Sequence, residues 1–267
     1  MRANDMPAQR LYREAGATPR KRVLLVEGTG DIAFLTLMLD KPPLREENVL
    51  ADWVITQAGG KDAVLRALGE RPDFYALVDQ DAWDAQERAE KQREYPHLYI
   101  LPRFCIENYL VCPDELVKAI PNFEREAEAI RQEIPKAVRH GCLWRAAQPL
   151  YDELIRAGFN RALLIYPPPD DREMERMLTA WQNLLCPGNL HIRMKDSMRE
   201  VQDASLDELA RKFIHGKVFW RGCVEEYAQK HFPGLKSDAL RRTVFRRLPL
   251  PEDLHIFLRD LFLKETR

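Results

Sequence analysis

The sequence predicts an α/β fold in which a small parallel sheet is followed by a mostly α-helical C-terminal region. Short runs of apolar and β-branched residues alternate with amphipathic segments over residues 22–101, a pattern typical of a parallel sheet with crossover helices. After Pro113 the spacing of apolar residues becomes helical. Hydrophobic residues are 45% and charged residues 31% of the 267 residues, so the chain can bury a core and is not predicted to be disordered.

Four strands are expected in the first part of the chain. They cover residues 22–26, 53–56, 74–78 and 98–101. Predicted helices follow the first three strands: the first begins after Gly28-Thr29-Gly30, the second after Gly59-Gly60, and the third covers the charged segment 83–94. Asp31 can cap the first of these helices, because its short carboxylate accepts hydrogen bonds from free backbone N–H groups.

The remainder of the chain is predicted to be mostly helical. Helical periodicity covers residues 114–134, 143–157, 172–185, 206–214, 217–230, 237–246 and 252–264. The apolar run at 162–166 is either a strand or the end of a buried helix, and the triple proline at 167–169 is a rigid break. We therefore divide the chain into an N-terminal arm at 1–20, a core at 21–112, and a helical region at 113–267 that is a candidate to complete the core and to contact substrate or partner. The arm is basic, with six basic and two acidic residues over 1–22.

Composition excludes several classes of protein. Formal charge is −1, from 41 basic and 42 acidic residues, so the chain is not a uniformly basic nucleic-acid binder. The five cysteines are scattered without a C-x-x-C pair, which argues against a disulfide framework and a structural zinc site. No apolar run approaches the 18 residues of a membrane span, and the first residues lack the apolar core of a secretory signal. We therefore expect a cytoplasmic protein with no membrane association.

Acidic residues follow three of the predicted strands. Glu27 ends the first strand and Asp31 comes four residues later, Asp79 and Asp81 end the third, and Glu107 follows the fourth. Ligands of an open parallel sheet bind outside the carboxyl ends of its strands, and clustered carboxylates are destabilising unless a cation neutralises them. Oxygen ligands without nearby Cys or His suit Mg²⁺ or Mn²⁺. The alternative is that Asp31 is a helix cap and that Asp79 and Asp81 only form loops.

Residues 28–33 (GTGDIA) also fit the dinucleotide-binding pattern G-x-G-x-x-G/A after a strand. This pattern offers a second hypothesis, an NAD-type oxidoreductase. We disfavour it because Glu27 and Asp31 would bring negative charge to the pyrophosphate. The second strand ends in Thr56-Gln57 and so lacks the carboxylate that normally holds the ribose.

Three ordered motifs resemble a Toprim domain, the Rossmann-like metal-binding fold of topoisomerases, primases and OLD-type nucleases. They are Val26-Glu27-Gly28 with Asp31 after the first strand, Gly59-Gly60-Lys61 after the second, and Val78-Asp79 with Asp81 on the third. The segment 102–110 (PRFCIENYL) and the later Gly216-Lys217 resemble the standalone Toprim proteins found beside ABC-type ATPases in anti-phage defence, such as the toxin subunit of the PARIS system. The motifs lie within 22–110, apart from Gly216-Lys217.

The resemblance implies a metal-dependent endonuclease of the OLD-like type. Carboxylates matching Glu27, Asp31, Asp79, Asp81 and Glu107 would bind Mg²⁺ or Mn²⁺. A lysine matching Lys217 would stabilise developing charge, and Glu27 could instead act as general acid or base. A non-catalytic Toprim-like adaptor is a third hypothesis.

The resemblance also implies a biological role. The protein would be a toxic effector that causes abortive infection and that an ABC-type ATPase partner subunit holds inactive until phage infection. The chain has no G-x-x-x-x-G-K-[ST] motif of its own. The nucleic acid cleaved is expected to be RNA, such as tRNA, because a toxin stops growth fastest through translation. A homodimer is one candidate for the active form.

A basic segment lies near the C-terminus. Residues 211–247 contain ten basic and three acidic residues. Two arginine pairs, Arg241-Arg242 and Arg246-Arg247, are about one helical turn apart and are predicted to share a face. Arginines on one face commonly contact nucleic-acid phosphates. The alternative is a solvated helix face or a protein contact.

Overall fold

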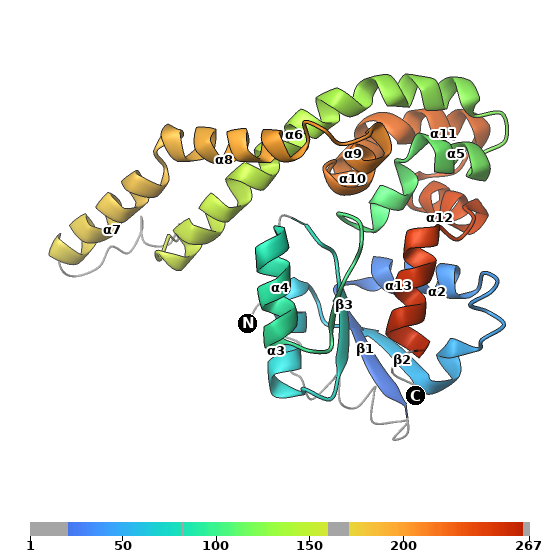
Figure 1. Cartoon of the computed structure of the whole chain (residues 1–267), viewed down its shortest axis with the longest axis horizontal. Coiled ribbons are helices and arrows are strands. Elements are labelled where there is room, and N and C mark those ends of the chain that lie inside the picture. Colours follow the sequence, from blue (N-terminus) through green and yellow to red (C-terminus); the bar gives the residue numbers. More distant parts are fainter. Residues whose placement is uncertain (1–20, 82, 160–170, 264–267) are drawn as a thin grey trace.

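The computed structural model describes residues 21–81, 83–159 and 171–263, and its fold is α/β (Figure 1). Four parallel strands form one sheet in the order β2-β1-β3-β4. They are β1 (Arg22–Val26), β2 (Trp53–Gln57), β3 (Tyr75–Val78) and β4 (Leu98–Ile100). Each matches its predicted segment to within one residue at either end. β1 pairs with β2 on one side and β3 on the other, so the ends of β1 and β3 flank a topological switch point, where ligands of such sheets bind.

Helices cover both faces of the sheet (Figure 1). One face carries α3 (Lys61–Glu70) and α4 (Ala85–Glu94); the other carries α2 (Thr29–Leu39) and α13 (Glu252–Leu263). Alternate side chains of β1 point to opposite faces: Val23 and Leu25 pack with the α3 side, and Leu24 and Val26 with the α2 side. Burial on both faces explains why β1 is a continuous apolar run rather than an alternating one.

The C-terminal helices complete the core of the sheet. The Trp53 ring of β2 lies 5.0 Å from the Phe262 ring of α13, measured between ring centroids. Phe34 of α2 lies 5.0 Å from Phe245 of α12 (Ser237–Arg247). Described residues of the regions 21–112 and 113–267 therefore share one hydrophobic core. Packing between the two regions helps to stabilise the sheet.

The first helices after the sheet differ from the prediction. Separate helices at 114–134 and 143–157 are wrong, because α5 (Pro113–Ala119) is short and α6 (Glu124–Arg156) is a single helix of 33 residues. It runs through Pro135 and Pro149, although proline usually breaks a helix. A stripe of buried residues along α6 offsets this cost, since packing contributes most of a helix's stability in proteins. The stripe includes Ala127, Ile130, Ile134, Val138 and Cys142.

The other helices are α7 (Asp171–Leu184), α8 (Pro187–Glu200), α9 (Leu206–Lys212), α10 (Gly216–Phe219) and α11 (Glu225–His231). A π-helical turn at Trp220–Val224 joins α10 to α11. α8 was not predicted, and none of its residues is completely buried. It packs instead along α6.

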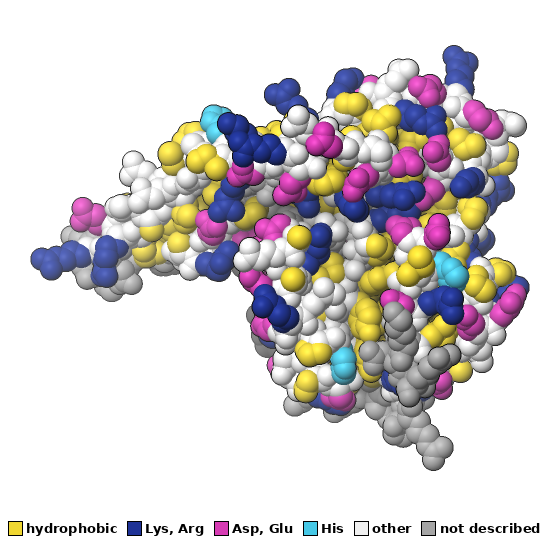
Figure 2. Space-filling view, viewed as in Figure 1, with side chains coloured by type: hydrophobic (Ala, Val, Ile, Leu, Met, Phe, Trp, Pro, Cys, Tyr) yellow, Lys and Arg dark blue, Asp and Glu magenta, His cyan; other side chains and the backbone are white. Residues whose placement is uncertain are grey.

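The end of α6 forms a helical extension with α7 and α8 that projects away from the sheet (Figure 1). Apolar side chains lie on the surface of this helical extension (Figure 2). The exposed residues include Leu143, Tyr151, Ile155, Leu178, Leu185 and Ile192. Elsewhere on the face shown in Figure 2, basic and acidic side chains are interspersed, in keeping with the near-neutral composition.

Three predicted features, the basic arm at 1–20, the apolar run at 162–166 and the prolines at 167–169, lie outside the described residues. Among the helices that the structure describes, none has the length and apolar character needed to cross a bilayer.

Candidate functional site

The ends of β1 and β3 meet through Glu27 and Asp79. Glu27 Oε1 accepts a hydrogen bond from the backbone N–H of Asp79 at 2.9 Å. The carbonyl of Glu27 accepts from the N–H groups of Gly59 and Gly60 at 3.1 and 2.9 Å. Both glycines have positive φ, 96° and 121°, which glycine adopts at little cost. The glycine pair therefore lets the turn after β2 close onto the end of β1 and fixes the backbone of Glu27.

Asp31 stands beside them at the start of α2. Gly28 is the N-cap residue, and its backbone N–H donates to Asp31 Oδ2 at 2.8 Å. The prediction that Asp31 is the N-cap is therefore wrong, because the N-cap is Gly28, three residues earlier. The Asp31 carboxylate instead accepts from the N-cap residue from its place in the first turn, as in a capping box. The bond places the Asp31 carboxylate at the start of α2, where a dinucleotide pyrophosphate would bind, so the contact does not favour the oxidoreductase hypothesis.

Asp79 and Asp81 are brought together by a turn rather than by a continued strand. β3 ends at Val78, and Asp81 has a left-handed backbone with φ of 51°. The N–H of Asp81 donates to the carbonyl of Phe104 at 2.9 Å. This bond ties the turn to the chain after β4.

Two lysines neutralise part of this negative charge. Lys61 Nζ lies 2.6 Å from the carbonyl oxygen of Asp79 and 2.6 Å from Asp81 Oδ2, and it also lies over the Trp83 ring. Lys217 Nζ lies 3.3 Å from Asp79 Oδ2. Sequence reasoning selected Lys217 but did not assign Lys61 to the site. The available signal was the position of Lys61 directly after the two glycines of the β2 turn.

Glu107 supplies the fifth carboxylate from the short 3₁₀ helix Ile106–Leu110. Its side chain is 2% exposed. One oxygen, Oε1, pairs with Arg241 of α12 at 2.6 Å, whereas the buried Oε2 has no hydrogen-bond partner among the residues described. An unpaired buried carboxylate oxygen is costly, so Glu107 has unused capacity to bind a cation.

The structure thus gathers the predicted residues into one carboxylate cluster, made up of Glu27, Asp31, Asp79, Asp81 and Glu107. Burial raises the pKa of Asp79 well above its usual range, and the charges of Asp81 and Glu27 raise it further against the opposing effect of Lys217. Burial also raises the pKa values of Glu27 and Asp31. The pKa of Lys217 is raised too: burial alone would lower it, but the carboxylates of Asp79 and Glu107 outweigh burial. Lys61 and Lys217 therefore neutralise only part of the negative charge of the cluster.

These shifts predict how metal-free stability depends on pH. The folded state holds protons on Glu27, Asp31 and Asp79 that the unfolded state releases above its ordinary carboxylate pKa of about 4, so this contribution to stability falls as pH rises through the raised folded-state values. We expect Asp79→Asn to flatten the fall. Urea unfolding in EDTA over about pH 4 to 8 measures it, and parallel curves for the two proteins would contradict the prediction.

The donor set of the cluster fits a hard divalent cation. Carboxylate oxygens are the ligands that Mg²⁺ and Mn²⁺ prefer, and the unpaired Oε2 of Glu107 is available. With Lys61 and Lys217 placed as they are, no three Asp, Glu, His or Cys side chains of the described residues surround one point closely enough to hold an ion. In this arrangement the lysine ammonium groups provide the positive charge.

Asn108 and Gly216 position Lys217. Asn108 is fully buried, and its Nδ2 donates to the carbonyls of Ala210 at 2.7 Å and Ile214 at 3.0 Å. A Cβ atom on Gly216 would lie 2.4 Å from Asn108 Oδ1 and 2.8 Å from its backbone nitrogen. Only glycine therefore allows α10 to begin this close to the helix that carries Glu107.

We expect Gly216→Ala to destabilise the fold by about 1–3 kcal/mol, the usual cost of overpacking, and to displace Lys217. Gly222→Ala is the matched control, because a Cβ there meets no atom within 4 Å and alanine favours helix. Urea unfolding of the two variants measures the difference. Equal stability would show that the Gly216 contact relaxes without cost.

The four arginines of α12 do not form one open face as predicted. Arg241 is paired with Glu107 and Asp238, and Arg247 lies over the Phe232 ring at 4.7 Å. Residues six apart on a helix are rotated by about 240°, which is why these two side chains diverge. Arg242, Arg246 and Arg247 are exposed, whereas Arg241 is half-buried.

Comparison with known proteins adds no family to this description. No protein-family model matches the chain, and no curated protein matches it.

Proposed function

We propose that the chain is a Toprim-like nuclease, a Mg²⁺- or Mn²⁺-dependent phosphodiester hydrolase that acts as a toxic effector in anti-phage defence. One observation carries the proposal: five carboxylates and two lysines converge where β1 and β3 end. This is the edge at which parallel sheets bind their ligands. The order of the motifs along the chain supports the Toprim assignment.

Glu27, Asp31, Asp79, Asp81 and Glu107 are the residues that would hold the metal. When bound, the cation supplies positive charge to phosphate oxygens and lowers the pKa of a water molecule. Lys61 and Lys217 now share this acidic site, so metal binding requires their ammonium groups to give way or to turn toward the substrate.

Lys217 and Glu27 have roles in the chemistry that follow from their surroundings. Lys217 stays protonated because Asp79 and Glu107 raise its pKa, so its ammonium group can donate to a phosphate oxygen as negative charge builds up. Glu27 has a raised pKa, mainly through burial, and a raised pKa favours the protonated form that a general acid uses. Glu27 is therefore proposed as ligand or as general acid and base.

We further propose an RNA substrate, such as tRNA, and an ABC-type ATPase partner that holds the effector inactive. Induced expression with and without the partner tests this regulation. Toxicity of the chain alone, suppressed by the ATPase, is expected. Equal growth in both cultures would refute the effector role.

Metal dependence is tested on purified protein. Cleavage of labelled tRNA and of single-stranded RNA and DNA is followed in Mg²⁺, Mn²⁺ and EDTA, alongside thermal unfolding. A cation that binds only the folded state stabilises it by about 2.7 kcal/mol at a hundred times its Kd. We expect this shift in the wild type and its loss in the Asp79→Asn/Asp81→Asn variant. No cleavage of any substrate and no metal-linked shift would sink the proposal.

Arg242 and Arg246 are the proposed phosphate contacts outside the carboxylate cluster. Changing both to Gln should weaken binding to RNA of any sequence. It should also flatten the slope of log affinity against log salt by about 0.7 for each phosphate that is no longer neutralised. Binding titrations at several salt concentrations measure this slope. If the slope stays unchanged while the ATPase partner no longer binds, this surface is a protein interface instead.

A further inference from the structure

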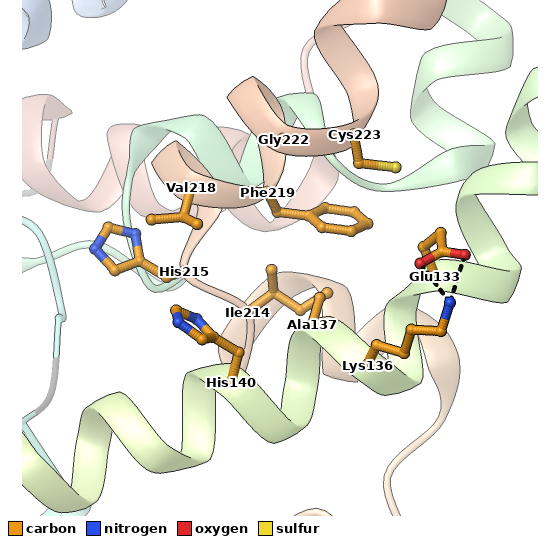
Figure 3. A pocket seen from close by; sticks show the side chains of 10 residues that line it. All are labelled: Glu133, Lys136, Ala137, His140, Ile214, His215, Val218, Phe219, Gly222 and Cys223. Atoms are coloured by element: carbon orange, nitrogen blue, oxygen red, sulfur yellow. Dashed lines mark hydrogen bonds and ion pairs between the residues drawn. The ribbon is translucent and has the colours of Figure 1, made fainter.

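A cavity of about 260 Å³, separate from the carboxylate cluster, lies between α6 and the segment that leads into and through α10 (Figure 3). Apolar side chains of Ala137, Ile214 and Phe219 line it. The volume is below the range of about 300–1,000 Å³ that is typical of sites for drug-sized ligands. The cavity therefore suits a single small group, such as one ring system, rather than a large ligand.

Two imidazoles, those of His140 and His215, lie at one end of this pocket (Figure 3). The ring of His215 is held in place by aromatic neighbours: its centroid is 5.1 Å from Trp144 and 5.4 Å from Phe104. Its Nδ1 atom is buried and has no hydrogen-bond partner in the part of the chain that the structure describes. His215 therefore contributes a ring held by aromatic neighbours to the lining of the pocket.

The opposite end of the pocket is polar. Lys136 Nζ pairs with both carboxylate oxygens of Glu133, at 2.9 and 3.0 Å, on consecutive turns of α6 (Figure 3). An apolar centre with a few polar groups at its ends is the usual character of a small-ligand site. A planar, polar-edged group can lie on the apolar floor and meet hydrogen-bonding partners at either end.

The histidine end of the pocket adjoins the carboxylate cluster. His215 precedes Lys217 by two residues, so their Cα atoms are at most about 7 Å apart. Burial lowers the pKa of His215, and the charge of Lys217 lowers it further, while Asp81 and Glu107 act in the opposite direction. These charges act on His215 because the cluster is close by. A nucleotide with its phosphate at the cluster can therefore reach the pocket with a neighbouring base.

A π-helical turn forms part of the wall. Gly222 and Cys223 belong to the turn Trp220–Val224 and line the pocket. Such turns are rare and frequently occur at functional sites. A Cβ on Gly222 would meet no atom within 4 Å, so space is open at this position.

We propose that this pocket receives one unpaired nucleobase of the strand that is cleaved at the carboxylate cluster. The inference rests on the proposed function and specifies its substrate: the strand must be single-stranded or looped beside the cleaved bond. Proteins read unpaired bases by stacking them on aromatic side chains, including histidine, and by hydrogen bonds to their edges. A base within a duplex is not available for this contact.

Gly222→Leu tests the proposal by placing a bulky side chain at the wall of the pocket, where a Cβ atom meets no other atom within 4 Å. Leucine replaces a helical glycine, so helix propensity improves and the fold should be retained. Gly69→Leu is the matched control, since Gly69 is an exposed glycine of α3 with no atom within 4 Å of its Cβ position. Urea unfolding confirms that both variants fold.

The readout is binding of labelled single-stranded RNA oligonucleotides in EDTA, with one abasic nucleotide moved stepwise along the strand. In the wild type, an abasic nucleotide at one position should weaken binding by about 5- to 150-fold, the range for loss of one stacked base. Gly222→Leu should weaken the intact oligonucleotide to a similar extent and remove the penalty at that position. Gly69→Leu should behave as the wild type.

The proposal is overturned if Gly222→Leu binds intact RNA as the wild type does, or if it keeps the same abasic penalty. The pocket would then serve another occupant, such as a side chain of a partner protein. Because this assay contains no metal and measures only binding, its result is separate from the nuclease proposal, which fails on the absence of metal-dependent cleavage.

Discussion

Replacing Glu27 with glutamine is expected to abolish metal-dependent cleavage while the metal-free protein keeps its fold. Gln retains a side-chain oxygen that can accept the hydrogen bond from the Asp79 N–H, now 2.9 Å from Glu27 Oε1. It removes one negative charge from a cluster in which burial, and then the charges of Asp81 and Asp31, raise the pKa of Glu27, so stability without metal should not fall. Initial rates of cleavage should drop at least about 100-fold, the scale of removing an acid–base group.

The comparison with Glu27→Ala separates charge from structure. Alanine leaves the buried N–H of Asp79 without a partner, which costs about 1–3 kcal/mol. Glu27→Ala therefore loses activity through both the lost carboxylate and the lost hydrogen bond, whereas Glu27→Gln loses only the carboxylate. Glu70→Gln, at an exposed position of α3, is the control for the same chemical change. A Glu27→Gln protein that cleaves at the wild-type rate, or that fails to fold, would remove Glu27 from the proposed mechanism.

The sheet could be predicted because its strands leave a strong local signal. β1 is buried on both faces, so every residue after Arg22 is apolar, and such a run followed by glycines has few other interpretations. The edge at which the strands end follows from their parallel order. Glu27 and Asp79 could therefore be placed together from sequence.

The partners of the carboxylates could not be predicted in the same way. Arg241 pairs with Glu107 across 134 positions of the chain, and that contact depends on how α12 packs against the 3₁₀ helix Ile106–Leu110. Lys61 reaches Asp81 through a turn whose left-handed residue, Asp81 itself, carries no distinctive sequence signal. Contacts that depend on tertiary packing produce no periodic pattern in the sequence, so they could not be predicted from it.

The helical region shows the same limit. Pro135 and Pro149 are local signals to end a helix, yet α6 continues through both because its buried stripe packs on its neighbours. α8, which was not predicted, packs along α6 although none of its residues is completely buried. In both cases tertiary packing outweighs intrinsic propensity.

The largest loss of stability is expected from Arg103→Met. Arg103 is fully buried after β4 and donates hydrogen bonds to Glu115 of α5 at 2.6 and 2.5 Å and to Asp253 of α13 at 2.8 and 2.9 Å. It also lies over the Tyr109 ring at 4.0 Å. Methionine fills part of the space but removes the guanidinium group that both carboxylates contact. Removing one partner of a buried ion pair costs about 3–5 kcal/mol, which urea unfolding at neutral pH would measure.

Neutralising the acids tests whether charge or shape causes this loss. Arg211 lies 3.7 Å from Glu115 and can compensate part of its charge, so Asp253 should account for more of the effect. Adding Asp253→Asn and Glu115→Gln to Arg103→Met should recover much of the stability, because a buried ion pair replaced as a whole is often nearly neutral. If the triple variant is as unstable as the single one, the guanidinium acts through packing on Tyr109 and its bond to the Asn108 carbonyl. In that case packing, and not charge, holds α13 to the sheet. Arg103→Lys, which keeps the charge but not the planar fork, would then distinguish the remaining hydrogen bonds from stacking on Tyr109.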